Sequence, residues 1–150
     1  MARQDWKAAI STLEDVLALK PDHKEAKALK AHSIKERDAA ELLEDGESLI
    51  EKGKHEEAKL ILKKVPTGTK AYERAKTTLE HTDRTLAYNY LTEATTLAKS
   101  KKKKDWVKAH AKFVSSIELN STDKTALERL RKLEKKMKKK RVRFKAYSPS

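Results

Sequence analysis

The sequence contains no cysteine, only three glycines and three prolines among 150 residues, and no long run of apolar side chains. The absence of cysteine excludes a disulfide framework, a thiolate zinc site and a thiol nucleophile. The scarcity of glycine and proline excludes a turn-rich all-β chain. No apolar run reaches the roughly 18 residues of a membrane span, and the first residues lack the apolar core of a signal peptide. We therefore expect a cytoplasmic location.

Charged side chains make up 39% of the chain, well above the usual quarter or so, whereas hydrophobic residues are only 37%. So few apolar residues predict a thin, elongated core. Stacked pairs of helices have a core of this kind, because each unit buries its apolar face only against its neighbours.

One stretch of sequence, beginning at Asp5, occurs again one hundred residues later, beginning at Asp105. The matching pairs are Trp6 with Trp106, Ala9 with Ala109, Leu13 with Phe113, Leu17 with Ile117 and Leu19 with Leu119. A third, weaker copy lies halfway between them, where Ala58 is followed by Leu62 and Val65. Such a period indicates a helical repeat, in which we expect Trp6 and Trp106 to pack at helix crossings.

The repeated stretch resembles the second helix of a tetratricopeptide repeat (TPR), in which an alanine packs at the crossing and large apolar residues follow. The residues that carry the resemblance are Trp6, Ala9, Leu13, Val16 and Pro21 in the first copy, Gly53, His55, Ala58, Leu62 and Val65 in the second, and Trp106, Ala109, Phe113 and Ser116 in the third. The first helix of the motif is recognisable once, as Leu42, Gly46 and Leu49. The TPR period is 34 residues, whereas this one is near fifty. We therefore predict an all-α, TPR-like α-α superhelix of about three degenerate repeats with lengthened helices.

Residues that begin or end helices divide the sequence into alternating short and long helical segments. The predicted helices cover residues 4–19, 22–52, 55–65, 70–100, 105–119 and 123–140. The second is either one long helix, which we prefer because it accounts for the long period, or two helices broken near Arg37-Asp38, and Thr122 or Asp123 caps the last. Pro21 ends the first, Asp22 is expected to cap the second, and Gly53 closes it. Residues 1–140 then form one helical repeat domain, expected to be a fragment of a larger protein, and residues 141–150 a basic, disordered tail or linker.

The TPR resemblance implies a concave groove, lined by the first helices of each pair, that binds a peptide or protein segment. The groove candidates are Leu43, Glu47, Ile50, Glu51, Tyr72, Tyr88, Asn89 and Glu93. Carboxylate-clamp members of the family use Lys and Asn on these helices, and Leu43 and Glu47 stand in their place here. The resemblance thus favours a non-catalytic protein-interaction scaffold. A homodimer stays open, because the first copy lacks its preceding helix.

Positive charge is concentrated near the end of the chain and gives an alternative function. Residues 131–145 hold ten Lys or Arg side chains and one acid, Glu134, within a net charge of +13 for the chain. The candidate anion-binding residues are Lys101, Lys102, Lys103, Lys104, Lys138, Lys139, Lys140, Arg141 and Arg143. They could bind nucleic acid or an anionic surface by releasing counterions. The alternative is that these residues bind no ligand and form a solvated helix end, where the negative end of the helix dipole favours cations. We rank nucleic acid below a protein partner.

Catalytic and metal motifs are missing from the sequence. His55-Glu56-Glu57-Ala58 is not followed by the second histidine of a His-Glu-x-x-His metal motif. No glycine cluster is available to cradle phosphate, and Ser115-Ser116 has no nucleophile elbow around it. The sequence predicts no enzyme activity, no metal and no cofactor.

Overall fold

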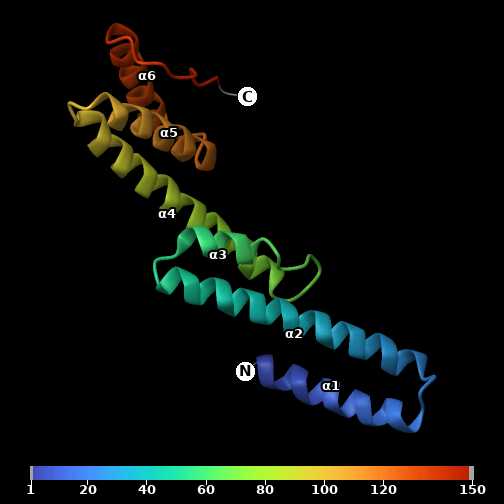
Figure 1. Ribbon diagram of the computed structural model, residues 1–150. Coiled ribbons are helices and arrows are strands. Elements are labelled where there is room, and N and C mark those ends of the chain that lie inside the picture. Colours follow the sequence, from blue (N-terminus) through green and yellow to red (C-terminus); the bar gives the residue numbers. More distant parts are fainter. Residues whose placement is uncertain (1, 149–150) are drawn as a thin grey trace. The chain divides into compact units, whose positions relative to one another are not determined.

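The computed structural model describes residues 2–148, with side chains described from Asp5 onward. Six helices are present in that range (Figure 1). They are α1 (Ala2–Leu19), α2 (Lys24–Glu51), α3 (His55–Leu62), α4 (Tyr72–Lys99), α5 (Lys103–Leu119) and α6 (Lys124–Lys139). The prediction of an all-α chain is confirmed. None of the described helices is both long enough and apolar enough to cross a membrane.

Local hydrogen bonds fix the residues at which the helices begin and end. Gly53 has φ +73° and donates its N–H to the Ile50 carbonyl at 2.9 Å, which ends α2 in the left-handed conformation that glycine tolerates. Asp123 caps α6 by accepting from the backbone N–H groups of Thr125 and Ala126. The expected Asp22 cap of α2 is wrong: α2 begins at Lys24, so His23 precedes it and its Nδ1 accepts from the Ala26 N–H at 3.4 Å.

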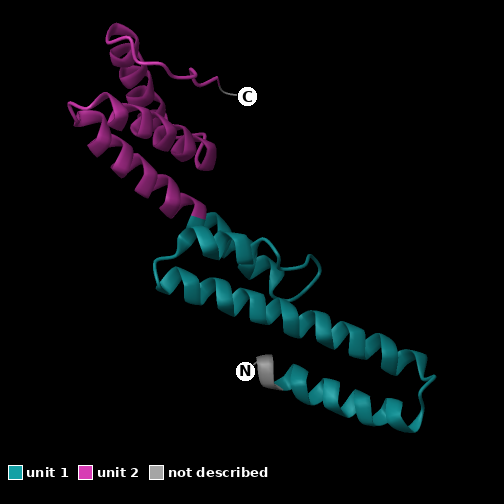
Figure 2. Cartoon of the chain, viewed as in Figure 1, with its two compact units in different colours: residues 1–82 teal, residues 83–150 magenta. Residues whose placement is uncertain are grey.

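Contacts divide the chain into two compact units, residues 1–82 and 83–150 (Figure 2), whereas a single domain over residues 1–140 was expected. In unit 1, α1 runs antiparallel to α2 and α3 packs on α2. The buried cluster of this unit consists of Ala39, Leu43, Leu62, Val65, Ala71 and Ala75. Gly46 lets α3 approach, because a Cβ there would stand 2.5 Å from Leu62 Cδ2.

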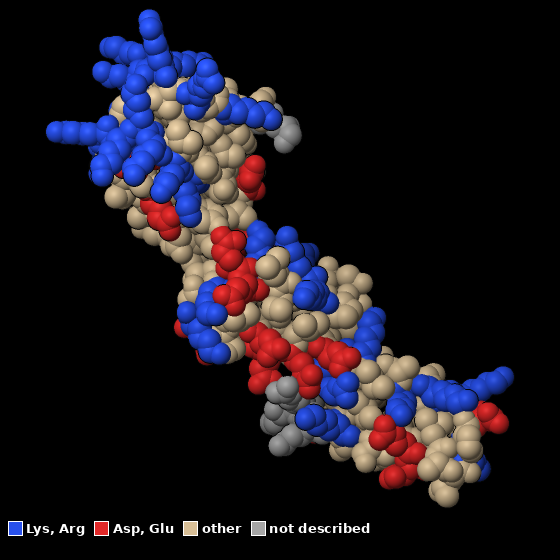
Figure 3. Space-filling view, viewed as in Figure 1, with Lys and Arg blue, Asp and Glu red and all other residues tan. Residues whose placement is uncertain are grey.

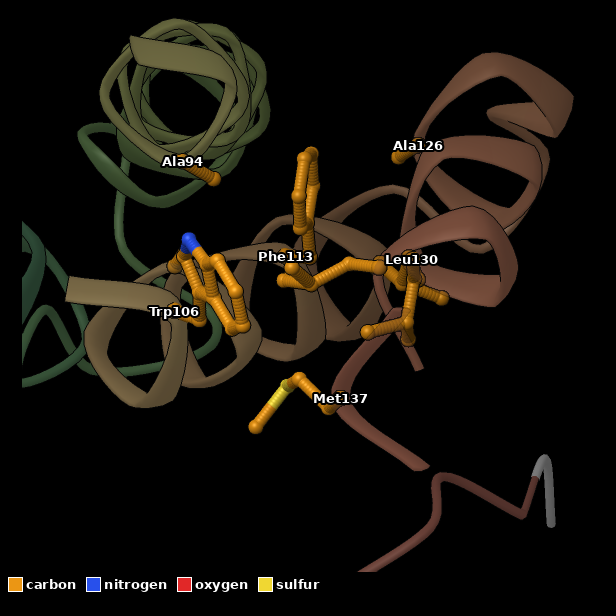
Figure 4. Packing of buried hydrophobic residues seen from close by; sticks show 9 residues of the cluster. Ala94, Trp106, Phe113, Ala126, Leu130 and Met137 are labelled. Carbon is orange, nitrogen blue, oxygen red and sulfur yellow. The ribbon is translucent and has the colours of Figure 1, made fainter. Parts of the chain in front are cut away.

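Unit 2 is built on the second half of α4 together with α5 and α6. Its core is a set of buried side chains that point toward one another between these helices (Figure 4): Ala94, Trp106, Ala109, Phe113, Ile117, Ala126, Leu130, Leu133 and Met137. Ser116 Oγ donates to the Ala87 carbonyl at 2.8 Å and so joins α5 to α4. Trp106 packs at the crossing as predicted, whereas Trp6 is half-buried and lies edge-on to His32.

The described part of the expected disordered tail lies against unit 2. After Arg141, whose φ is +53°, the chain is extended, and Val142, Phe144 and Tyr147 pack on the core while Arg143 and Lys145 are exposed. Val142 and Phe144 alternate with basic residues, which places both on one side of an extended segment. Tyr147 falls outside this alternation and is held by its backbone N–H bond to Glu134. Residues 149–150 lie outside the described range.

Candidate functional site

The groove candidates of unit 1 are largely occupied by internal packing. Leu43 is buried in the unit 1 core, with Ile50 and Tyr72 packed against it. Glu47 accepts two hydrogen bonds from Arg74, each 2.8 Å long, and Glu51 is exposed. The structure therefore brings this set together, but most of its side chains hold α2 to the start of α4 and do not face an open groove.

The remaining groove candidates lie on the part of α4 that belongs to unit 2. Tyr88 is 69% exposed and Asn89 is exposed as well. Glu93 pairs with Lys112 of α5 at 2.9 Å, and the Lys112 ammonium lies 4.4 Å from the centre of the Tyr90 ring. A hollow of about 490 Å³ beside them is lined by Tyr90, Glu93, Leu97, Lys108, Ala111, Lys112 and Ser115. Its charges already neutralise one another in part.

A second hollow of unit 2 is lined by cations and apolar residues without an acid, and we name it the α4–α6 pocket. It encloses about 420 Å³ and is lined by Thr95, Ala98 and Lys99 of α4, Phe113 of α5, and Arg129, Lys132, Leu133 and Lys136 of α6. Phe113 and Leu133 are buried core residues, so the base of the pocket is apolar. Four cations surround that base.

Two of these cations are held in place by neutral groups. Arg129 Nη1 donates to Thr95 Oγ1 at 2.8 Å, and Lys136 Nζ donates to the Ala98 carbonyl at 3.0 Å. The Lys136 ammonium also lies 4.1 Å from the centre of the Trp106 ring, a cation–π distance. These contacts fix the positions of the two charges without neutralising them.

No ion pair among the described residues joins a carboxylate to any of the four pocket cations. Lys and Arg side chains gather over the same end of unit 2, around the α4–α5 turn and α6 (Figure 3). Like charges that share a hollow repel one another, and an anion placed among them relieves that repulsion. The pocket therefore favours a negatively charged ligand with an apolar part.

The lysine-rich segments identified in the sequence lie at opposite ends of their helices. Lys138, Lys139 and Lys140 are exposed at the C-terminal end of α6, where positive charge is favoured by the helix dipole. Lys101–Lys104 are exposed at the N-terminal end of α5, where the dipole disfavours positive charge. Arg141 and Arg143 are exposed as well. The helix dipole thus accounts for the lysines at α6 and not for those at α5.

Sequence reasoning missed the α4–α6 pocket. Arg129, Lys132 and Lys136 stand at positions i, i+3 and i+7 of one helix, so they share a face. That spacing is present in the sequence, but the many other lysines of α6 make it hard to distinguish. The contribution of Lys99 from α4 depends on tertiary packing and had no signal in the sequence.

One titratable pair of unit 2 supports the packed tail. His110 Nε2 lies 2.9 Å from Glu134 Oε1, and the same oxygen accepts from the Tyr147 backbone N–H at 3.0 Å. The Phe144 ring centre lies 5.2 Å from that of His110. The pair therefore links α5, α6 and the tail. Among the described residues, no group of three or more His, Cys, Asp or Glu side chains could hold a metal ion.

Comparison of the chain with protein-family models, with curated proteins and with solved structures finds no match. The resemblance to TPR proteins therefore rests on the sequence residues named above alone.

Proposed function

We propose that the chain is a TPR-like helical repeat that binds a protein partner without catalysing a reaction. The repeat is supported by Ala58 and Ala109, which are both 0% exposed on the short helices α3 and α5. The 28-residue lengths of α2 and α4 account for a period longer than that of the TPR family. We place this module in the cytoplasm as part of the same proposal.

The observation that carries the binding role is the α4–α6 pocket. It combines a base of core side chains with four cations that have no carboxylate partner among the described residues. Interfaces that bind proteins characteristically surround an apolar centre with polar and charged groups. We infer that a segment of the partner protein occupies this pocket, and not the groove first expected at Leu43, Glu47 and Tyr72.

A second candidate function is binding to nucleic acid or to an anionic surface. The observation that favours it is Lys101–Lys104, exposed at the positive end of the α5 dipole, where lysine does not stabilise the helix. Binding of this kind is dominated by phosphate contacts and weakens steeply with salt. A protein interface centred on apolar contacts loses less affinity as the salt concentration rises.

Affinity capture from lysate of the source cells separates the two functions. The bait is the whole chain, because truncation after Glu134 would remove Met137, which is 0% exposed in the core. Lysate with and without nuclease treatment is used at low and high salt, with a variant in which Lys101–Lys104 are replaced by glutamate. We expect the same protein to be retained in every condition. Recovery of nucleic acid alone, lost in the variant and at high salt, would show that the second function is correct.

The oligomeric state is a separate part of the proposal. Leu19 is 85% exposed and Leu29 55% exposed in the α1–α2 hairpin, which leaves apolar surface for a second copy of the chain. Analytical ultracentrifugation of the wild type and of Leu29→Glu tests it. A dimer in the wild type and a monomer in the variant support a homodimer through this hairpin.

A further inference from the structure

We propose that the α4–α6 pocket recognises an acidic amphipathic helix of the partner. The bound helix places large apolar side chains on the pocket base and Asp or Glu side chains against the cations. This inference rests on the proposed protein-binding function and names the chemistry of the partner.

The base of the pocket is suited to an apolar side chain. Phe113 is 1% exposed and Leu133 is 3% exposed, so they close the pocket from beneath, and the methylene stems of the surrounding Lys and Arg side chains supply apolar surface that a ligand can reach. Ala98, which is half-buried, adds a small residue at the α4 wall. A hollow of about 420 Å³ lies within the range of natural binding pockets, which are mostly apolar with a few polar groups that fix orientation.

The cations of α6 are spaced for a partner helix. Arg129, Lys132 and Lys136 lie along one face, and the first and last are separated by about 10 Å at a rise of 1.5 Å per residue. A helix that lies alongside α6 with acids at i, i+3 and i+7 presents one carboxylate to each cation. Lys99 supplies a further positive charge from the opposite wall.

Two of the recognition groups are held in position before binding. The bond from Arg129 to Thr95 and the bond from Lys136 to the Ala98 carbonyl restrict both side chains. Each keeps further N–H donors for a carboxylate, since guanidinium has five and ammonium has three. Restricting a long side chain in advance reduces the entropy lost on association.

The same features disfavour a nucleic acid in this pocket. Binding of single strands uses aromatic faces on which bases stack. Here Trp106 is 5% exposed and has the Lys136 ammonium over its ring, and Phe113 is 1% exposed. A phosphate backbone would use the cations but leave the apolar base without a partner.

Fluorescence anisotropy with the whole chain tests the proposal. The probe is a fluorescein-labelled synthetic helix of about 16 residues, in which a leucine stripe lies beside a stripe of glutamates at i, i+3 and i+7. Three comparison ligands are a scrambled peptide of the same composition, a polyglutamate of equal charge and a single-stranded oligothymidine. We expect the amphipathic peptide to bind more tightly than all three.

A matched pair of variants assigns the binding to the pocket. R129E/K132E reverses two pocket charges, and R131E/K138E reverses one Arg and one Lys that are exposed on α6 and do not line the pocket. We expect about tenfold or greater loss of affinity in the first variant only. Lys132→Glu alone keeps the Arg129–Thr95 bond and should still weaken binding.

Equal loss in both double variants, equal binding of the scrambled peptide, or no binding of the amphipathic peptide would overturn the inference. If a protein is still captured from nuclease-treated lysate in any of these cases, the proposed protein-binding function stands and only the acidic helix is wrong. Preference for oligothymidine, together with recovery of nucleic acid alone from lysate, would overturn both.

Discussion

At the scale of single residues, Gly46 sets how closely two helices of unit 1 approach. Glycine in a helix interior costs about 1 kcal/mol relative to alanine. Its place in α2 is explained by Leu62 of α3, whose Cγ and Cδ2 would lie 2.7 and 2.5 Å from a Cβ at position 46. Close packing thus outweighs helix propensity at this position.

Gly46→Ala should destabilise the chain despite the gain in helix propensity. Forcing a methyl group against buried Leu62 costs about 1–3 kcal/mol, so after the gain in helix propensity we expect a net loss of up to about 2 kcal/mol in urea denaturation. Asp45→Ala is the control, because Asp45 is exposed on the same helix. The double variant with Leu62→Ala should be less destabilised than the sum of the two single changes. Additive effects would show that the close contact is not the cause.

At the scale of elements, the extended tail completes the core of unit 2. Val142, Phe144 and Tyr147 pack against the helical cluster, and the Tyr147 N–H bonds to Glu134. The alternation of residues 141–147 is visible in the sequence, but a seven-residue segment at a chain end has no sequence signal that shows a place to pack. That place is formed by α5 and α6 together.

Phe144→Ala should destabilise unit 2 by about 1–3 kcal/mol, less than the 3–5 kcal/mol of a fully buried phenylalanine, because Phe144 is only partly buried. Lys145→Ala, which changes an exposed neighbour, should stay within about 0.5 kcal/mol of the wild type. Thermal unfolding followed by circular dichroism measures both. Equal midpoints for the two variants would mean that the tail does not pack in solution.

The sequence predicts the helices better than the proposed binding site for a physical reason. Helix periodicity, Pro21 and Gly53 act locally, so the elements could be placed within a few residues. The α4–α6 pocket needs Lys99 and Arg129 to meet across two helices, and Leu43 was assigned to a groove although packing with Leu62 buries it. Both depend on tertiary contacts, which a spacing pattern does not specify.

At the scale of the whole molecule, the division into two units predicts that a destabilising substitution in one unit affects mainly that unit. Phe113→Ala removes a side chain that is 1% exposed in unit 2, at a cost of about 3–5 kcal/mol. Separate compact units of a chain can open with different free energies. Amide hydrogen exchange should therefore accelerate mainly in residues 83–148. Uniform acceleration across residues 5–148 would show a single cooperative unit.

The most direct test of the binding role is site-specific photo-crosslinking in the source cells. A benzophenone amino acid replaces Thr92, which is exposed one turn before Thr95 on the same face of α4, or Ala28, which is exposed on α2. We predict a protein adduct from position 92, absent from position 28 and reduced by Lys132→Glu. Adducts with nucleic acid, or a protein adduct that is unchanged by Lys132→Glu, would contradict binding of a protein partner at the α4–α6 pocket.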